Sequence, residues 1–317
     1  MMTKTRIIID CDTGIDDALA ILYALRAPNV IVEGITTVFG NIDVEQAADN
    51  TLRLLALAQP GYEIPVALGA SQALVRESTG FATHVHGENG IGDVQLPAAT
   101  QRPVSETASE FIIRTAKENP GEIVLVTLGR LTNLSLALEM EPTLKETLKK
   151  VVVMGGTIFR PGNSTPVAEA NIWGDPEAAD HVFTSGLPIT MVGLDVTLKT
   201  RITAEHLELL NRYGREENKA IIAFMEQSLR HYFNFYRETN YLQNSAPLHD
   251  PLALMVALQP DLVTYRQMKV RVEHKGEHTA GMVVADLRPQ PKVGHFIEVA
   301  VDVDADRALG LFLSVFM

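Results

Sequence analysis

Cysteine is almost missing from this chain of 317 residues, which contains only Cys11. A single cysteine excludes an intrachain disulfide and suits a reducing compartment, so we expect a cytoplasmic protein. Cys11 stands between Asp10 and Asp12. Because two neighbouring carboxylates disfavour a thiolate, we do not expect this cysteine to act as a nucleophile.

Basic residues and long apolar runs are also scarce. Lys and Arg total 27 against 39 Asp and Glu, which gives a formal net charge of -12. With no basic block to offset it, this charge argues against nucleic acid as a partner. No stretch approaches the roughly 18 uncharged apolar residues of a membrane-spanning helix, and the short basic start leaves no room for a signal-peptide apolar region. We therefore expect a soluble protein with no membrane partner.

Segments typical of strands and of helices alternate through the first two-thirds of the chain. Apolar, β-branched runs predict strands at 6–9, 30–37, 65–68, 123–128, 151–154 and 189–192. Apolar residues at helical spacing, or an acid followed by proline, predict helices at 18–25, 44–58, 105–117, 131–140 and from Asp175 and Asp250. This alternation predicts an α/β fold with an open, mostly parallel, Rossmann-like sheet and helices on both faces.

The remaining segments complete this prediction. Residues 204–237 become helical and more charged, which indicates a peripheral helical region. Two long polar loops, 71–103 and 157–172, are candidates for a functional role because of their length. No linker or repeat divides the chain, so we expect a single domain over residues 1–317. C-terminal strands that extend or flank the sheet are predicted at 270–273, 281–286 and 295–303.

Four aspartates lie within eight residues, at the turn between the first predicted strand and helix. They are Asp10, Asp12, Asp16 and Asp17, at the strand end where open α/β sheets place their sites. Clustered carboxylates repel one another unless a cation or a hydrogen-bonded polyol takes up their charge, and calcium or magnesium suits such ligands. The alternative is helix capping, with Asp12 or Thr13 as N-cap and the later acids complementing the helix dipole. We favour metal or polyol binding, because capping requires only one or two acids.

Other polar residues follow predicted strand ends, so this fold would gather them on the same edge of the sheet. Each has a structural alternative: Asn41 as a turn residue, Asn133 as a cap or packing residue, His86 as a surface histidine, and Asp250 as an N-cap. The residues expected at this edge are Asn41, Leu128, Asn163, Glu169, Asn171, His249 and Asp250.

With these motifs, the chain resembles the calcium-dependent nucleoside hydrolases, the inosine-uridine preferring ribohydrolase family. The segment DCDTGIDDA at 10–18 is similar to the N-terminal signature of that family, and the resemblance covers residues 6–310. It implies hydrolysis of the N-glycosidic bond of ribonucleosides in nucleoside salvage, one Ca²⁺ per subunit, and a homodimer or homotetramer. Further segments follow in the family order: TVFGN at 37–41, HG at 86–87, LGRLTN at 128–133, VMGG at 153–156, GN at 162–163, EAN at 169–171, DPEAA at 175–179 and HDP at 249–251.

The resemblance also implies roles for single residues. Asp12 matches the aspartate that contacts calcium and acts as general base on the metal-bound water. Asp17, the main-chain carbonyl of Leu128, and Asp250 match the remaining calcium ligands, and we assign Asp10 to support of the turn. The residues that match groups around the ribose are Asp16, Asn41, Met154, Asn163, Glu169, Asn171 and Asp250.

On the side of the leaving base, the resemblance is less detailed. His249 matches a histidine near the leaving base and is the candidate acid for purine departure, and His86 matches a histidine near the base in some members. The residues that contact the base are not fixed by the sequence, and neither is the preference for purine or pyrimidine. Aromatic candidates for this contact are Tyr232, Tyr236 and Tyr241.

Two positions depart from the family pattern. Ala170 replaces a phenylalanine that is common in the family, which alters the expected pocket wall. Arg130 stands where proline or glycine is frequent, and we expect it to affect only the start of the following helix.

Two other classes of protein share part of the pattern. A magnesium-dependent phosphatase with an aspartate nucleophile also begins with an Asp-x-Asp turn, but it needs threonine or valine where Gly14 stands. A non-catalytic nucleoside- or sugar-binding protein could keep the calcium site without turnover. The intact Asp12 and His249 argue against that alternative, because binding alone requires neither a general base nor an acid.

Overall fold

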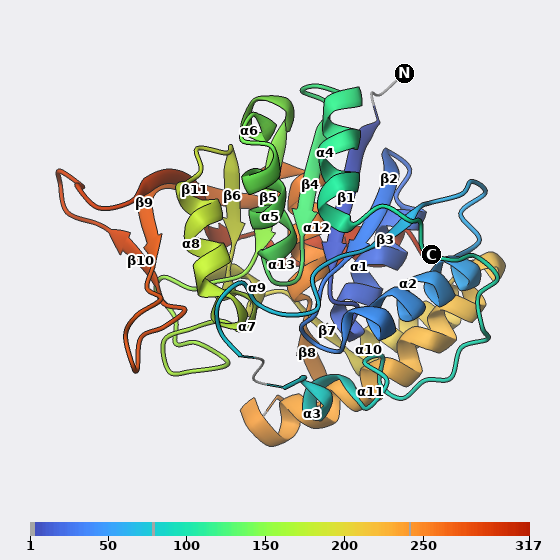
Figure 1. Cartoon of the computed structure of the whole chain (residues 1–317). Coiled ribbons are helices and arrows are strands. Elements are labelled where there is room, and N and C mark those ends of the chain that lie inside the picture. The colour runs from blue at the N-terminus through green and yellow to red at the C-terminus, as the bar shows by residue number, and fades with distance from the viewer. Residues whose placement is uncertain (1–3, 78–79, 241) are drawn as a thin grey trace.

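A computed structural model of the chain describes residues 4–77, 80–240 and 242–317 (Figure 1). Tyr241, one of the aromatic candidates, lies outside the described residues. Within them, nine strands form the main sheet, in the spatial order β10 (Val283–Asp286), β9 (Val263–Val272), β11 (His295–Val303), β6 (Ile189–Val192), β5 (Lys150–Met154), β4 (Ile123–Thr127), β1 (Thr5–Cys11), β2 (Val30–Thr37) and β3 (Val66–Leu68).

The pairing of these strands confirms the predicted sheet. Neighbouring strands from β3 to β11 run parallel, whereas β9 pairs antiparallel with both β11 and β10. The C-terminal strands therefore extend the parallel sheet at one edge. The strand predicted at 270–273 is only the end of β9, because polar residues such as Arg266 and Gln267 interrupt its apolar pattern and are exposed.

Helices cover both faces of the sheet, as predicted (Figure 1). Side chains alternate along each strand, so Ile7 and Ile9 of β1 join one hydrophobic cluster while Ile8 joins the other. The second cluster receives α4 (Ala108–Glu118), α5 (Thr132–Met140), α6 (Leu144–Thr147) and α8 (Pro176–Thr184). The first receives α1 (Ile15–Arg26), α2 (Val44–Ala58), α10 (Ala204–Tyr213), α11 (Lys219–Asn240), α12 (His249–Leu258) and α13 (Ala305–Ser314).

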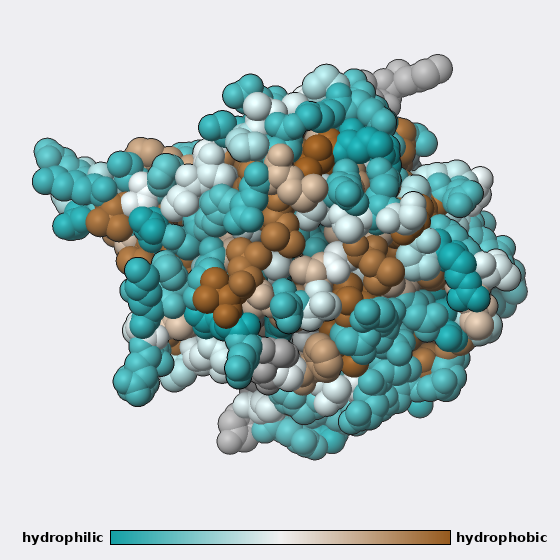
Figure 2. Space-filling view, viewed as in Figure 1, coloured by the Kyte–Doolittle hydropathy of each residue, from teal (hydrophilic) through white to brown (hydrophobic). Residues whose placement is uncertain are grey.

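The peripheral helical region predicted at 204–237 consists of α10 and α11, which contact each other. Helix α11 buries Ile221, Phe224 and Met225, while its outward face and that of α2 are largely hydrophilic in Figure 2. Such amphipathic helices pack on a core along one face only. No helix among the described residues is long and apolar enough to cross a membrane.

The structure also contains elements that the sequence analysis did not predict. Helix α13 stands at the C-terminal end, where only strands were expected. The two long loops contain short helices, and a small second sheet joins β7 to β8. The additional elements are α3 (Thr83–His86), α6, α7 (Ala170–Gly174), α9 (Leu194–Thr197), β7 (Arg201–Thr203), β8 (Ser245–Pro247) and the 3-10 turns η1 (Glu216–Asn218) and η2 (Pro260–Leu262).

Candidate active site

The aspartate turn lies at the carboxyl end of β1, where the chain passes into α1. Gly14 is the N-cap of α1, and Oδ2 of Asp17 accepts a hydrogen bond from the Gly14 N–H at 2.8 Å. Neither Asp12 nor Thr13 therefore caps the helix. Capping accounts for one oxygen of Asp17 and leaves the other carboxylates of the turn to be explained.

Three buried carboxylates converge beside this turn. Asp16 and Asp17 come from the first turn of α1 and Asp250 from the first turn of α12, and one oxygen of each lies within 4.8 Å of the others. Among the described residues, Oδ1 of Asp16 and Oδ1 of Asp17 have no hydrogen-bond partner. Buried carboxylate oxygens without donors are costly, and a group of oxygen ligands suits a hard divalent cation. These acidic residues can therefore hold a metal ion.

Burial and mutual repulsion raise the pKa of the acids at this site. Burial raises the pKa of Asp10 to about 7 and that of Asp16 to about 8, and the charge of a neighbouring carboxylate adds to each shift. The pKa values of Asp12 and Asp250 are raised for the same two reasons. The positive charge of Arg130 opposes the shift at Asp12. The site therefore favours an added positive charge.

Asn41 links Asp12 to Asp17. Its Nδ2 lies 3.1 Å both from Oδ1 of Asp12 and from Oδ2 of Asp17, and its main-chain N–H donates to Oδ2 of Asp12 at 2.8 Å. Gly40 permits this approach, because a Cβ there would lie 1.8 Å from Oδ2 of Asp12. Asn41 thus fixes the carboxylate of Asp12 in addition to its place in the turn after β2.

Asp10 is not one of the three converging carboxylates and instead connects neighbouring elements. Its Oδ1 accepts hydrogen bonds from Oγ1 of Thr36 at 2.6 Å and from Nδ2 of Asn133 at 2.8 Å. Asn133 also donates to the carbonyl of Thr37 at 2.9 Å. The pair ties β1 to β2 and to α5, so Asp10 supports the turn, and Asn133 is a packing residue here and not an N-cap.

A second group of expected site residues surrounds the carboxyl ends of β4 and β5. The Leu128 carbonyl accepts a hydrogen bond from Nδ2 of Asn171 at 2.6 Å, and the same nitrogen lies 3.2 Å from the Met154 carbonyl oxygen. The buried carboxylate of Glu169 accepts three main-chain N–H groups, after β5 and in α7. Asn163 is exposed and accepts a hydrogen bond from the main chain at the start of α7. It is therefore the most peripheral of these residues.

A hydrogen-bonded row of side chains approaches the cluster from α9, α11 and α12. Nδ1 of His249 lies 2.7 Å from Oγ1 of Thr197, and Nε2 lies 2.8 Å from the Tyr236 hydroxyl. The Tyr232 hydroxyl donates to Oδ2 of Asp16 at 3.3 Å, and the two tyrosine rings meet edge to face with centroids 4.9 Å apart. Burial lowers the pKa of His249 to about 4. Thr197 was not expected at the site, because the short helix that carries it was not predicted.

His86 is buried, so the interpretation as a surface histidine was wrong. It is 5% exposed, and its Nδ1 accepts a hydrogen bond from the main-chain N–H of Ile15 at 3.0 Å. The same nitrogen lies 4.0 Å from Oδ1 of Asp16, and the ring lies 5.7 Å from that of Tyr232. Burial lowers the pKa of His86 to about 3. The short helix α3 thus brings a histidine from the first long loop to the site.

Arg130 differs most from its expected role. It was expected to affect only the start of α5, but it is 7% exposed and its guanidinium carbon lies 4.2 Å from the centroid of the Phe39 ring. Its charge interacts with the carboxylates of Asp12, Asp175 and Glu169. The arginine therefore lies at the site. The sequence analysis missed this role, because the neighbours of Arg130 come from three separate loops that meet only in the folded chain.

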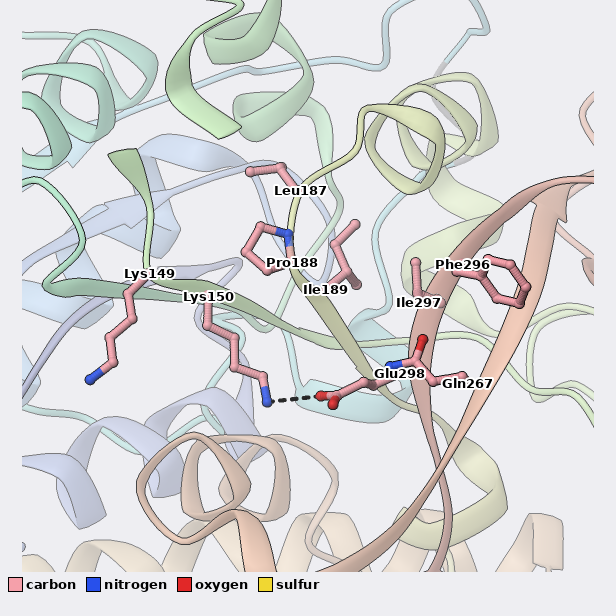
Figure 3. Close-up of a pocket in the computed structure, with 9 residues that line it drawn as sticks. All are labelled: Lys149, Lys150, Leu187, Pro188, Ile189, Gln267, Phe296, Ile297 and Glu298. Atoms are coloured by element: carbon pink, nitrogen blue, oxygen red, sulfur yellow. Dashed lines mark hydrogen bonds and ion pairs between the residues drawn. The ribbon is translucent and has the colours of Figure 1, made fainter. Parts of the chain in front are cut away.

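A separate pocket of about 310 Å³ lies away from the aspartate turn, and Figure 3 shows the residues that line it. It is lined by residues at the amino ends of β5 and β6, and an ion pair of 3.0 Å joins Nζ of Lys150 to Glu298. Parallel strands place the aspartate turn at their carboxyl ends, so this pocket is remote from the acid cluster. It contains no comparable group of carboxylates and histidines.

Comparison with known families identifies the family to which the chain belongs. The family model described as inosine-uridine preferring nucleoside hydrolase matches residues 7–310. The chain belongs to this family. The match confirms the resemblance seen in the sequence, and the expected enzyme class, a ribonucleoside hydrolase, is confirmed by it and by named relatives. It also excludes the aspartate-nucleophile phosphatase as the better interpretation of the turn.

Individual relatives of this nucleoside hydrolase family differ in the bases that their names mention. Uridine nucleosidase 1 of Arabidopsis thaliana is 40% identical over 86% of this chain and 79% of its own length. The pyrimidine-specific ribonucleoside hydrolase RihA of Salmonella paratyphi C is 39% identical over 95% of this chain and 94% of its own. The structure of a purine-preferring ribonucleoside hydrolase from Gardnerella vaginalis superimposes with a TM-score of 0.91 at 37% identity, covering 98% of both chains. Family membership alone therefore does not set the base.

Proposed function

We propose that this ribonucleoside hydrolase uses a calcium-assisted attack of water on the anomeric carbon, with Asp12 as general base, and that it serves nucleoside salvage. One observation carries the proposal. Buried carboxylates of Asp16, Asp17 and Asp250 converge beside Asp12, and two of their oxygens lack a donor among the described residues. Unpaired buried carboxylate oxygens are costly for the fold, and a bound cation or a hydroxyl group would supply their missing partners.

The residues at the turn fit a calcium ion. Asp12, Asp17, Asp250 and the main-chain carbonyl of Leu128 would hold it, and all four offer the oxygen atoms that calcium prefers. When bound, calcium would supply a Lewis acid that orients ribose hydroxyls and water and compensates the repulsion of the carboxylates. Asp16 lies in the same cluster, with an oxygen left to accept a hydroxyl of the ribose.

The chain's own residues would perform the proton transfer and stabilise the sugar. Asp12, fixed by Asn41, accepts the proton of the attacking water. Positive charge then develops on the ribose as the N-glycosidic bond breaks. The surrounding carboxylates are already positioned to stabilise that charge, so they do not have to rearrange during the reaction. Side chains around the ribose would be Asp16, Asn41, Met154, Asn163, Glu169, Asn171 and Asp250.

His249 and His86 would serve the leaving base. Nε2 of His249 is hydrogen-bonded to the Tyr236 hydroxyl. A proton donated to the leaving nucleobase would therefore come from a group that is connected to the buried row of side chains. Tyr232 and His86 flank the same space beside Asp16. A purine leaves more readily when protonated, so His249 would matter most for inosine.

A nucleoside panel tests this function directly. Free base is measured from uridine, cytidine and inosine, with calcium and with a chelator, beside the matching 2′-deoxyribonucleosides. We expect base release from ribonucleosides that is lost in chelator, and much slower release from deoxyribonucleosides, since the acids bind the 2′-hydroxyl. Nucleoside binding without any product would contradict the proposal and favour a non-catalytic binding protein. Equal turnover of deoxyribonucleosides would contradict the assigned contacts to the ribose.

We further propose that the chain is a single domain that forms a homodimer or homotetramer in the cytoplasm. The family resemblance supports the assembly, and the single cysteine supports a reducing compartment. Light scattering of the purified protein measures the assembly, and a monomeric mass would contradict it. Fractionation of the source cells locates the enzyme.

A further inference from the structure

Arg130 is a buried cation without a hydrogen-bonded partner. It is 7% exposed, and among the residues that the structure describes no carboxylate or carbonyl accepts a hydrogen bond from its guanidinium. Its guanidinium carbon lies 4.2 Å from the centroid of the Phe39 ring. Arginine is almost never buried unless it is paired, so its position requires another explanation.

The backbone around Arg130 holds it in this place. A Cβ at Gly174 would lie 2.1 Å from Nε of Arg130, and a Cβ at Gly129 would lie 3.1 Å from Cγ of Asp12. Gly174 therefore permits a close approach of the Arg130 side chain that a larger residue would obstruct, and Gly129 lets the main chain beside Arg130 lie against Asp12. The guanidinium lies beside the junction of α7 with α8, and Arg130 itself stands two residues after Leu128.

The surrounding charge gives this arginine an electrostatic role. Burial lowers the pKa of Arg130, and the carboxylates of Asp12, Asp175 and Glu169 oppose that shift by favouring its charged form. Asp12 connects through Asn41 to Asp17. A fixed positive charge in this environment offsets repulsion among the acids when no metal is bound. The same charge repels an incoming divalent cation, since neither group moves far in a buried site.

We propose that Arg130 is a built-in counter-charge that stabilises the metal-free acid site and weakens its affinity for calcium. This role rests on the calcium site proposed above. Arg130 would then be a positioning residue that acts through the metal site. The proposal predicts that the arginine stabilises the metal-free protein and disfavours the calcium-bound protein. If Arg130 only packed against Phe39, it would affect both states alike.

Calorimetric titration of the chelator-treated protein with calcium tests the proposal, using R130M, R130K and the parent. Methionine keeps an apolar stem of similar length without the charge, and lysine keeps the charge. We expect R130M to bind calcium about tenfold more tightly than the parent and R130K to stay within about twofold. Unchanged or weaker binding by R130M would overturn the proposal. If the parent itself binds no calcium, the proposed metal site fails, which is a distinct result.

Thermal unfolding provides a second measurement that needs no activity. In chelator, R130M should melt below the parent, and saturating calcium should close most of that gap, because calcium replaces the lost positive charge. R130Q, which keeps a polar amide over Phe39, should behave like R130M. A melting temperature lowered equally with and without calcium would overturn the proposal. So would neutral variants that fail to fold even in calcium while R130K folds, because calcium would then not replace the charge.

Discussion

The molecule buries aspartates in two regions and surrounds them differently. Asp180 on α8 is 8% exposed and Asp16 is 6% exposed. Arg271 donates to both oxygens of Asp180 at 2.8 and 2.6 Å, and the main-chain N–H of Val272 adds a bond of 2.9 Å. Burial alone would raise the pKa of Asp180, but these bonds outweigh it and lower the pKa. The pKa of Asp16 is instead raised to about 8.

The difference separates an acid that serves the fold from one that serves a ligand. Asp180 ties α8 to β9 and has all its partners within the chain, so its burial is compensated on folding. Asp16 has the Tyr232 hydroxyl on one oxygen and no hydrogen-bond donor among the described residues on the other. In the proposed mechanism, a bound cation and a ribose would complete the contacts of the cluster and offset the free energy that it costs the fold.

The largest effect that separates the two regions is expected from Asp12→Ala. Loss of the general base should reduce base release by about 10³-fold or more while the fold stays intact. The matched control is Asp180→Ala, which should lower stability and leave turnover per folded molecule nearly unchanged. Steady-state kinetics and thermal unfolding of both variants measure this. Near-normal base release by Asp12→Ala would refute the assigned mechanism.

Removing calcium should affect the acid cluster around Asp16 and leave the surroundings of Asp180 unchanged. In chelator we expect base release to be lost and the melting temperature to fall by several degrees, because ligand at a hundredfold excess over Kd contributes about 2.7 kcal/mol. Asp180→Ala should show the same calcium-dependent shift as the parent from a lower starting temperature. A parent whose activity and melting temperature ignore the chelator would contradict the calcium assignment.

His249→Ala should produce a smaller effect that depends on the base. If His249 supplies the proton to a purine, inosine turnover should fall at least about tenfold more than uridine turnover. Tyr236→Phe removes the hydroxyl that His249 contacts at 2.8 Å and serves as companion variant. Comparison of kcat/KM for both nucleosides decides the matter. Equal losses would assign His249 to binding.

Local patterns predicted the elements around the site better than its long-range contacts. The strands at 30–37 and 189–192 and the helix at 44–58 have the predicted bounds, because their apolar spacing is unambiguous. Helix α13 was missed, although the charged residues Asp304, Asp306 and Arg307 separate its apolar residues from those of β11. Its N-cap Asp304, which accepts a hydrogen bond from the Arg307 N–H, was the available signal.

The aspartate turn could be recognised in the sequence because its four acids lie within eight residues. The environment of Arg130 could not be recognised there. Phe39 lies 91 positions before Arg130 in the chain and Gly174 lies 44 after it. No local pattern connects these three residues, so only the fold reveals that the arginine faces the acids. The burial of His86 was missed for the same reason, since the short helix α3 carries it inward from a polar loop.

The smallest expected effects come from one chemical change made in both regions. Asp180→Asn weakens the bonds from Arg271, whose side chain is 46% exposed, so the free energy of unfolding should fall by only about 1–2 kcal/mol at pH 7. Because the pKa of Asp180 is lowered on folding, its contribution is present above the unfolded pKa and is lost as the pH falls through the folded value. The difference from the parent should therefore shrink in acid.

Asp16→Asn should have the opposite effect on the free energy of unfolding of the metal-free protein. The amide removes a charge that repels Asp17 and Asp250 without changing the size of the side chain, so stability in chelator should rise slightly. Urea unfolding of both asparagine variants in chelator measures the pair. Equal destabilisation by both substitutions would mean that the carboxylate of Asp16 stabilises the fold as the carboxylate of Asp180 does. The distinction between an acid that serves the fold and an acid that serves a ligand would then be wrong.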